Sequence, residues 1–272
     1  MMIWVNDRLV DESSATVSVL DHGLTVGDGV FETAKAVDGT AFALTRHLDR
    51  LSRSAEGLGL AAPDHALVRE GVRQVLAASP MELGRLRITY TGGTAPLGSE
   101  RGDAPPTLVI ALGTAKPRPD TTVVKTVPWR RNEHGALTGL KTTSYGENVV
   151  ALAAAHRAGA SEAIFANTAG RLCEGTGSNI FVVLGGRLLT PPVSSGCLAG
   201  ITRQLVVDWS GAEEADLPFE VLAEAEEVFL TSTLRDVQAV TRIDDRELAG
   251  PGPVTLKAMA QFTERAADDL DP

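Results

Sequence analysis

The feature that most constrains the fold of this chain is a short proline-flanked segment, Lys116-Pro117-Arg118-Pro119. It lies between two apolar runs that have the composition of strands. A proline ring fixes φ and removes a backbone donor, so two prolines so close together interrupt a sheet ladder and favour a linker. We therefore divide the chain into a small N-terminal domain (1–115), an interdomain linker (116–121) and a large domain (122–272).

Composition limits the class of protein. The 272 residues are enough to bury a sizeable core, and 43% hydrophobic with 22% charged residues is typical of a globular protein. A formal net charge of -10 disfavours nucleic acid or an anionic membrane as the main partner, because both attract positive surfaces. No apolar stretch approaches the ~20 residues of a membrane span, and the first residues do not resemble a signal peptide.

The two cysteines, Cys173 and Cys197, are too few for a disulfide framework and lack metal-ligand spacing. We therefore expect no metal site. A reduced, cytoplasmic setting is the simplest interpretation of this cysteine usage.

The first domain is predicted to be α+β. Apolar residues recur at helical spacing from Thr45, a candidate N-cap, and this pattern places Arg50 on the solvent-exposed side of the helix. A second helix is expected from Asp64 onward. Within Leu86–Tyr90, apolar and polar residues alternate, which predicts a strand with one polar face.

The second domain is predicted to mix strands and helices. A strand is expected at Thr122–Val127, and the following stretch, Trp129–Thr138, is expected to be irregular. Helical periodicity predicts a helix from about Asn148 to Ala158, another beginning at Gly200, and a closing amphipathic helix at Pro253–Asp268.

Lys141 is one of only five lysines and stands among small polar residues in a glycine-flanked junction. Lys35 and Lys125 fall in predicted strands, Lys116 in the linker and Lys257 on the last helix. A lysine that binds a carbonyl carbon must be partly desolvated so that it is neutral and nucleophilic. Taken alone, however, such a residue is more often an ordinary loop cation.

Three further stretches carry polar groups at element boundaries. Leu172–Asn179 places Glu174 before small residues that could contact an anion, or that could simply form a tight turn. Gly200-Ile201-Thr202 opens a helix, where backbone N–H groups and the helix dipole favour a phosphate; alone it is only a helix cap. Thr231-Ser232-Thr233 at a predicted strand end is equally weak by itself.

Together these motifs resemble the class IV, fold-type IV family of pyridoxal-phosphate enzymes. The family includes branched-chain and D-amino-acid aminotransferases and 4-amino-4-deoxychorismate lyase. The resemblance rests on six motifs in order along nearly the whole chain: Gly27-Asp28-Gly29-Val30-Phe31-Glu32, His47-Leu48-Asp49-Arg50-Leu51, Lys141, Glu174-Gly175-Thr176-Gly177-Ser178-Asn179, Gly200-Ile201-Thr202-Arg203 and Thr231-Ser232-Thr233. It implies a two-domain α+β fold like that of D-amino-acid aminotransferase, with a small N-terminal α+β domain and a larger, barrel-like C-terminal α/β domain.

The resemblance also implies roles. Lys141 would bind pyridoxal 5'-phosphate covalently and move the substrate proton. Glu174 would keep the pyridine nitrogen protonated, so that the ring accepts electrons from the substrate carbon. The implied cofactor-binding residues are Arg50, Ile201, Thr202 and Thr233 at the phosphate, Tyr145 near the phenolic oxygen, and Ser178 and Asn179 beside Glu174.

On the substrate side, the resemblance implies Phe31 and Thr33. Arg87, Arg130 and Arg131 are candidates for holding a substrate carboxylate, because a guanidinium fork matches it; a surface or salt-bridge role is at least as common for each. Family members are homodimers, so Gly93–Arg101 is expected to complete the neighbour's site.

The substrate side must distinguish the members of the family, since they share the cofactor motifs. Phe31-Glu32-Thr33 resembles the Phe-x-Thr of aminodeoxychorismate lyases, whereas branched-chain enzymes commonly have Phe-Glu-Gly. Ala95–Ser99 lacks the Arg-x-His of D-amino-acid enzymes. We therefore predict a 4-amino-4-deoxychorismate lyase, which forms 4-aminobenzoate and pyruvate for folate biosynthesis.

Two alternatives stay open. The closer one is a class IV aminotransferase that moves the amino group of a branched-chain or D-amino acid to a 2-oxo acid. The other is an α+β binding protein without catalytic activity, which the presence of both Lys141 and Glu174 disfavours.

Overall fold

The computed structural model describes residues 1–272, which form two compact units. Unit 1 consists of Met1–Pro117, Leu140–Ser144 and Leu270–Pro272, and unit 2 of Arg118–Gly139 and Tyr145–Asp269. The first boundary falls between the two prolines of the proline-flanked segment. Leu140–Ser144 packs with unit 1, although the sequence division assigned it to the large domain, because it extends along the edge of a unit 1 strand.

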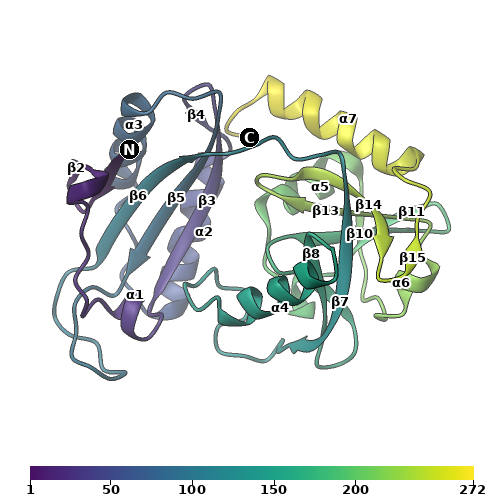
Figure 1. Cartoon of the computed structure of the whole chain (residues 1–272), viewed down its shortest axis with the longest axis horizontal. Coiled ribbons are helices and arrows are strands. Elements are labelled where there is room, and N and C mark those ends of the chain that lie inside the picture. The colour runs from purple at the N-terminus through teal and green to yellow at the C-terminus, as the bar shows by residue number, and fades with distance from the viewer. The chain divides into compact units, whose positions relative to one another are not determined.

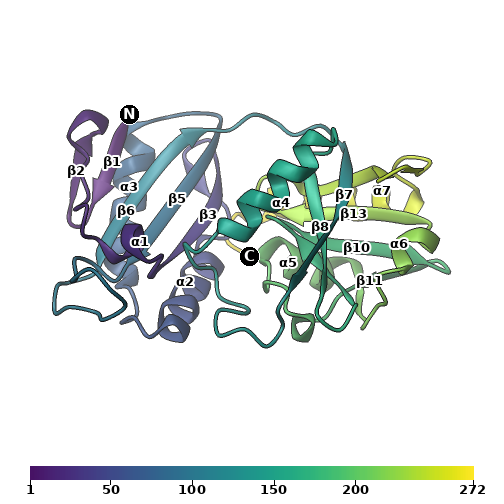
Figure 2. The same cartoon turned by 60° about the horizontal axis from the view of Figure 1, so that its bottom comes forward.

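Unit 1 is built on a six-stranded antiparallel sheet in the order β2-β1-β6-β5-β3-β4 (Figure 1). Helices α2 (Leu44–Leu58) and α3 (His65–Ala78) cover one face, and the core lies between them and the sheet (Figure 2). The short helix α1 (His22–Thr25) precedes β3. The strands are β1 (Met2–Val5), β2 (Arg8–Asp11), β3 (Gly29–Val37), β4 (Thr40–Ala41), β5 (Leu83–Thr91) and β6 (Thr107–Thr114).

Two predictions for unit 1 are confirmed. On β5, Leu86, Ile88 and Tyr90 are buried while the residues between them are not, as the alternation indicated. Helix α3 follows Asp64, whose carboxylate accepts hydrogen bonds from the first-turn N–H groups and so caps the helix.

The start of α2 differs from the prediction. The helix begins at Leu44, after Ala43 in the left-handed region (φ 52°), and Thr45 lies inside it rather than capping it. The last residues of the sequence stabilise this start: Thr45 N–H donates to Asp271 Oδ1 (2.8 Å), and Ala43 N–H donates to the carbonyl oxygen of Leu270 (2.7 Å). Because these partners are distant in the sequence, no local pattern indicated them.

Unit 2 contains a nine-stranded mixed sheet in the order β12-β11-β10-β13-β14-β7-β8-β9, with β15 paired to β14. Strands β9 and β10 lie far apart in this order, yet only residues 176–178 join them, so the sheet curls towards a partial barrel. The strands are β7 (Thr121–Arg131), β8 (Glu162–Asn167), β9 (Leu172–Gly175), β10 (Asn179–Leu184), β11 (Arg187–Thr190), β12 (Glu213–Glu214), β13 (Glu227–Ser232), β14 (Asp236–Ile243) and β15 (Arg246–Glu247).

The helices of unit 2 pack on both sides of this sheet. Helix α4 (Gly146–Arg157) packs against β7 and β8 through small alanine side chains. Helices α5 (Ile201–Ser210) and α7 (Pro253–Asp268) lie together over β13 and β14, while α6 (Val221–Glu224) joins the apolar core. The three predicted helices are thus confirmed. None of the helices is long and apolar enough to cross a membrane.

Strand β7 is longer than predicted, since it continues to Arg131, into the first part of the stretch expected to be irregular, while Asn132–Thr138 is irregular as predicted. Its register against β8 shifts between Thr126 and Arg130, around Pro128, which has no N–H to donate. Because of this interruption, the sequence pattern did not predict the second half of the strand. After the register shift, Arg131 is opposite Asn167 of β8.

Candidate active site

Lys141 lies in unit 1, in the segment that runs along the edge of β3. Its carbonyl oxygen accepts a hydrogen bond from Phe31 N–H (2.9 Å), and its own N–H donates to Ser54 Oγ of α2 (3.1 Å). The half-buried side chain places Nζ 4.4 Å from the centre of the Phe31 ring. These contacts give the amine the defined position and partial desolvation that a nucleophilic lysine needs.

Phe31, Thr33 and Arg87 lie together on the sheet face opposite α2 and α3. The Arg87 guanidinium carbon is 3.3 Å from the centre of the Phe31 ring, a close cation–π contact. Thr33 is directly opposite Arg87 in the β3–β5 register. The Phe31 ring therefore contacts both the amine of Lys141 and the guanidinium of Arg87, and Thr33 is paired with Arg87 on the same sheet face.

Arg50 is buried, so the helical-wheel prediction that it is exposed to solvent is wrong. Only 5% of its surface is exposed, because Nε and Nη2 each lie 2.7 Å from an oxygen of the fully buried Glu32 on β3. His47 Nδ1 is also 2.7 Å from Glu32. His47, Arg50 and Ser54 recur every three or four residues on α2, a polar stripe beside the apolar one that could have been found from the sequence.

The charges of this network are well defined. Burial acts to raise the pKa of Glu32, but Arg50 and then His47 outweigh it and hold that pKa well below its ordinary 4.5. Burial also lowers the pKa of His47 below its ordinary 6.5, despite the neighbouring carboxylate. His47 is therefore neutral, and its Nδ1 carries the hydrogen that Glu32 accepts. The hydrogen bonds to Glu32 therefore hold the Arg50 guanidinium in one position.

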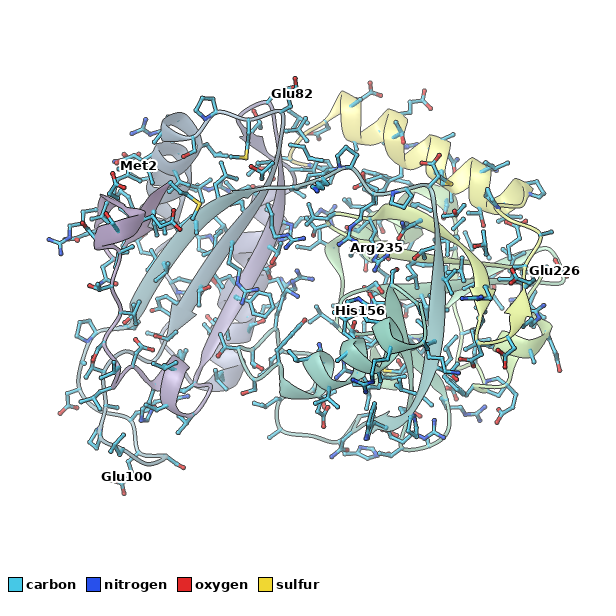
Figure 3. All side chains as sticks on the ribbon, viewed as in Figure 1. Met2, Glu82, Glu100, His156, Glu226 and Arg235 are labelled. Carbon is cyan, nitrogen blue, oxygen red and sulfur yellow. The ribbon has the colours of Figure 1, made fainter.

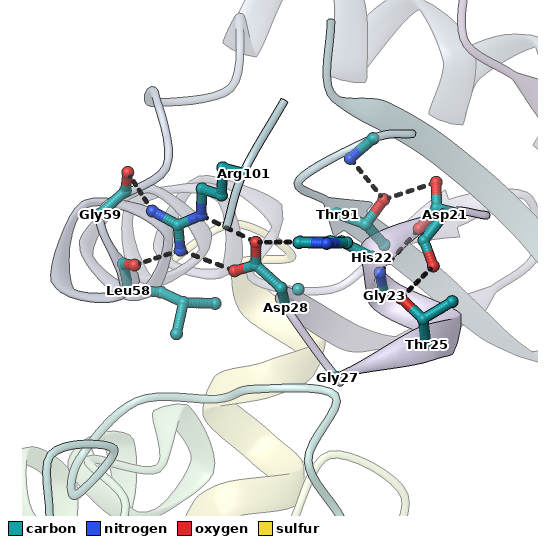
Figure 4. A network of polar contacts seen from close by, with 12 residues as sticks. Asp21, His22, Gly23, Thr25, Gly27, Asp28, Leu58, Gly59, Thr91 and Arg101 are labelled. Atoms are coloured by element: carbon teal, nitrogen blue, oxygen red, sulfur yellow. Dashed lines mark hydrogen bonds and ion pairs between the residues drawn. The ribbon is translucent and has the colours of Figure 1, made fainter. Parts of the chain in front are cut away.

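A second ion pair holds the Gly27–Gly29 turn (Figure 4). Arg101 Nε and Nη2 donate to the two oxygens of Asp28 at 2.7 and 2.6 Å, and this hydrogen bonding lowers the pKa of Asp28. The same guanidinium donates to the carbonyl oxygens of Leu58 and Gly59 at the end of α2. The β5–β6 loop, which we expected to reach a neighbouring subunit, is thus anchored at Arg101 to its own chain, a pairing that the sequence analysis missed.

Glu174 lies on β9 in unit 2, with 13% of its side chain exposed. Its Oε2 accepts a hydrogen bond from Leu198 N–H (3.0 Å), and its Oε1 is 3.2 Å from Arg131 Nε. The carboxylate is therefore held from both sides. For Arg131 the structure shows the salt-bridge role that the sequence left open, whereas Arg130 is exposed and lies over the Phe219 ring.

The first turn of α5 lies against the start of β10. Asn179 Nδ2 donates to the carbonyl oxygen of Leu198 (2.8 Å), and a Cβ at Gly200 would lie only 1.9 Å from Asn179 Oδ1. No side chain caps α5, and its first turn contains no acidic residue. The N–H groups of Ile201 and Thr202 have no partner within the helix, so this end suits an anion.

Strand β13 ends beside the same place. Thr231 is opposite Asn179 in the β10–β13 register, and its buried Oγ1 has no hydrogen-bond partner. Thr233 follows in a half-buried turn. A buried hydroxyl without a partner is costly unless a ligand or water satisfies it, so this atom marks a position for a hydrogen-bonding ligand.

Ser178 supports the turn between β9 and β10. Its Oγ donates to Glu162 Oε2 (3.0 Å), and Glu162 also accepts from Thr176 N–H (3.0 Å). Arg235, labelled in Figure 3, approaches the same buried carboxylate at 3.5 Å. The sequence analysis did not identify Glu162, whose bonds fix the backbone between Glu174 and Asn179.

Each unit gathers part of the expected residues. Unit 1 brings Phe31, Thr33, Arg87 and Lys141 together, and Arg50 binds to Glu32, which points to the opposite face of β3. Unit 2 gathers Glu174, Asn179, Ile201 and Thr202 around Leu198 and Gly200. Tyr145 precedes α4 as its N-cap residue.

These groups fit pyridoxal phosphate. Unit 1 holds a half-buried primary amine, a group that can bind an aldehyde, and unit 2 holds a carboxylate fixed by two donors, a group that can bind a protonated ring nitrogen. The uncapped start of α5, next to the unpaired Thr231 hydroxyl, provides donors for the phosphate. Groups of these kinds are typical of enzymes that use pyridoxal phosphate.

Comparison with known proteins identifies the family. The model described as amino-transferase class IV matches residues 29–243, and the chain belongs to this family. Its members depend on pyridoxal phosphate, and a hypothetical aminotransferase of Mycobacterium tuberculosis in its PLP-bound form matches with a TM-score of 0.88 at 26% identity, over 99% of this chain and all of that one. The fold type, the cofactor and the enzymatic nature predicted from the sequence are thereby confirmed.

Two relatives that are named as aminotransferases align with this chain over almost the whole length of both chains. A putative branched-chain-amino-acid aminotransferase of Methanocaldococcus jannaschii is 36% identical over 97% of this chain and 96% of its own. A D-alanine aminotransferase of Staphylococcus haemolyticus is 30% identical, with 96% of each chain covered.

Solved structures include both chemistries considered above. A branched-chain aminotransferase of Thermoproteus uzoniensis superposes with a TM-score of 0.89 at 31% identity, covering 97% of this chain and 94% of that one. A putative 4-amino-4-deoxychorismate lyase of Legionella pneumophila gives a TM-score of 0.88 at 25% identity, covering 93% and 97%.

Proposed function

We propose that this protein is a 4-amino-4-deoxychorismate lyase, which forms 4-aminobenzoate and pyruvate for folate biosynthesis in the cytoplasm. The observation that carries the proposal is the chemistry of the sheet face around Phe31. Alternation along β3 puts Thr33 and Lys35 on this face, and the register places Arg87 opposite Thr33 and Arg85 opposite Lys35.

This arrangement suits a dianionic ring substrate. The substrate carries one carboxylate on its ring and a second on its enolpyruvyl group. Directly opposed residues of an antiparallel pair are about 5 Å apart, so Lys35, Arg85 and Arg87 share one sheet face with Phe31. Arg87 lies over the Phe31 ring, and Lys35 Nζ lies 5.4 Å from the centre of the Phe42 ring. A branched aliphatic side chain would gain little there, because it would displace water from charged groups without replacing their hydrogen bonds.

Each residue has a defined part in the proposal. Pyridoxal phosphate, when bound, supplies an electron-accepting ring. With the cofactor bound, Lys141 would hold it and take the proton from the substrate carbon that bears the amine, and Glu174 would keep the ring nitrogen protonated. Arg50, Ile201, Thr202 and Thr233 would bind the phosphate, Tyr145 would contact the phenolic oxygen, and Ser178 and Asn179 would hold the backbone next to Glu174.

The proposed reaction balances without a second substrate. The carbon that bears the amine loses its proton, the C–O bond to the enolpyruvyl group breaks, and the ring becomes aromatic. The released enolpyruvate takes up a proton at its terminal carbon and becomes pyruvate. No amino acceptor, oxidant or water is consumed.

An aminotransferase is the second candidate, and the names of the relatives favour it. The 36% identity to the putative branched-chain enzyme extends over 97% of the chain. In this case Arg87 would hold the single carboxylate of an amino acid, and Lys141 would return the proton to the cofactor carbon.

The two candidates differ in whether they need a 2-oxo acid. Purified protein loaded with pyridoxal phosphate should release 4-aminobenzoate and pyruvate from 4-amino-4-deoxychorismate alone, with no dependence on added 2-oxoglutarate. In parallel, branched-chain and D-amino acids with 2-oxoglutarate should give little glutamate. Amino transfer without any 4-aminobenzoate would replace the lyase proposal with the aminotransferase.

We also propose that the protein is a homodimer. Unit 1 exposes a run of large apolar side chains, and the loop that carries Leu97, itself 79% exposed, lies next to it, since Ala95 N–H donates to the carbonyl oxygen of Leu20. Monomeric proteins rarely expose so many apolar side chains together, and a second copy of the chain would bury them. The run consists of Val17, Val19, Leu20, Leu24 and Val26.

A further inference from the structure

We infer that Arg131 is a positioning residue for Glu174: its guanidinium keeps this carboxylate ionised and aimed, and so determines how firmly the pyridine nitrogen of the cofactor retains its proton. The inference rests on the role proposed above for Glu174. The inference holds equally for a lyase that eliminates enolpyruvate and for an aminotransferase that transfers an amino group.

Three neighbouring strands bring the two residues together. Arg131 of β7 is opposite Asn167 of β8, and Phe165 of β8 is opposite Glu174 of β9. The Arg131 guanidinium carbon lies 4.1 Å from the centre of the buried Phe165 ring. The ring supports the planar guanidinium from one side, which is the arrangement that favours arginine over lysine.

The contact with Glu174 is the main charge interaction of Arg131. Its Nε is buried and makes no hydrogen bond of standard geometry, so the 3.2 Å contact with Glu174 Oε1 compensates its desolvation. The other approach is Nη1 to Glu147 at 3.5 Å, and the Glu147 side chain is 77% exposed to water. Leu198 N–H holds the second oxygen of Glu174, so the carboxylate is oriented by two donors from different elements.

Two thiols that interact with the charge of Glu174 are neutral. Burial, followed by the charge of Glu174, raises the pKa of the Cys197 thiol to about 11. The same two causes raise the pKa of Cys173 even further. Arg131, 3.2 Å away, is thus a cation that offsets the charge of Glu174. An adjacent guanidinium favours the ionised carboxylate, so a proton shared between Glu174 and the pyridine nitrogen stays on the nitrogen.

The spectroscopic test uses Arg131→Gln, with Arg130→Gln as the matched control. A protonated ring nitrogen withdraws electrons from the bond between lysine and cofactor. Loss of that ring proton should therefore raise the pH at which the visible absorption of the lysine-bound cofactor changes. We expect a midpoint about one pH unit higher in Arg131→Gln, with kcat about tenfold lower and KM nearly unchanged. Arg130→Gln, on the exposed neighbour, should match the wild type in all three. Identical titrations for wild type and Arg131→Gln would overturn the inference.

A cofactor analogue separates positioning from simple damage to the fold. When C–H replaces the ring nitrogen, Glu174 has no proton to hold, so Arg131→Gln should lower the rate less than about twofold relative to wild type with the same analogue. An equal loss of rate with both cofactors would assign Arg131 a purely structural role. Arg131→Lys keeps the charge, so the midpoint of its absorption titration should lie close to that of wild type. This variant also serves as the test if Arg131→Gln does not bind the cofactor. A midpoint of Arg131→Lys that is one pH unit above wild type would then contradict the inference.

The outcome is distinguishable from a failure of the proposed function. The absorption titration needs no substrate, so it applies equally to a lyase and to an aminotransferase. A wild-type protein without any visible band would reject the cofactor role of Lys141 and Glu174. A normal wild-type band with an unshifted Arg131→Gln rejects only the role of Arg131.

Discussion

At the scale of single residues, contacts from distant parts of the chain fix the position of Lys141. Phe31 N–H and Ser54 Oγ hold both of its peptide groups, and the Phe31 ring lies beside the amine. These partners come from a strand and a helix distant in the sequence. The sequence therefore identified Lys141 only through the family resemblance. The residues next to Lys141 in the sequence were not enough to distinguish it from an ordinary loop lysine.

Replacing Lys141 with alanine should remove both the cofactor link and the base. We expect no borohydride-sensitive visible band and a rate at least about a thousandfold lower, since a positioned base alone contributes two to four orders of magnitude. Absorption spectra and steady-state rates of the purified variant measure both. Lys257→Ala, an exposed position on α7, is the control and should behave like wild type. A Lys141→Ala variant with an intact band would identify a different lysine as the cofactor residue.

At the scale of elements, the sequence predicted most of what depends on local periodicity. The one-sided strand β5, the cap of α3 and the long helices of unit 2 follow from apolar spacing and from a capping carboxylate. The burial of Arg50 and the second half of β7 did not follow. Both depend on partners in other elements: Arg50 needs Glu32 of β3, and β7 resumes after Pro128 only because β8 is there to pair with it.

The ion pair between β3 and α2 should control stability in acid. His47 has a lowered pKa, so below its ordinary 6.5 the unfolded chain binds more protons than the folded one, and stability falls. Glu32 also has a lowered pKa, so a further loss begins below its ordinary 4.5. Urea denaturation as a function of pH should therefore show decreasing stability from 6.5 downward, steepest below 4.5.

Glu32→Gln tests this assignment. The variant leaves the buried Arg50 charge without its partner and should lose about 3–5 kcal/mol of unfolding free energy at neutral pH. The difference from wild type should shrink below pH 4.5, where wild-type Glu32 loses its advantage. Glu56→Gln, an exposed position on the same helix, should change stability little. A neutral-pH loss that persists undiminished in acid would mean that packing, rather than charge, is responsible.

At the scale of the whole molecule, the proposed dimer follows from the exposed apolar run of unit 1. Light scattering at micromolar concentration should give a mass twice the 28.6 kDa of the chain. Leu24→Lys combined with Val19→Lys should weaken association at least about tenfold, because a buried unpaired charge is costly. Leu256→Lys, an exposed apolar position on α7, should not. A monomeric wild-type protein would contradict the proposal.

The contact between Thr45 and Asp271 has a consequence for the order in which the chain folds. The two residues are separated by 226 positions, and a ribosome releases them many seconds apart at roughly 5–20 residues per second. The first turn of α2 therefore gains this contact only after Asp271 has been made, whereas the edge of β3 gains its partner as soon as Leu140–Ser144 has been made. Because Leu270–Pro272 belongs to unit 1, this unit stays incomplete while most of unit 2 is being translated.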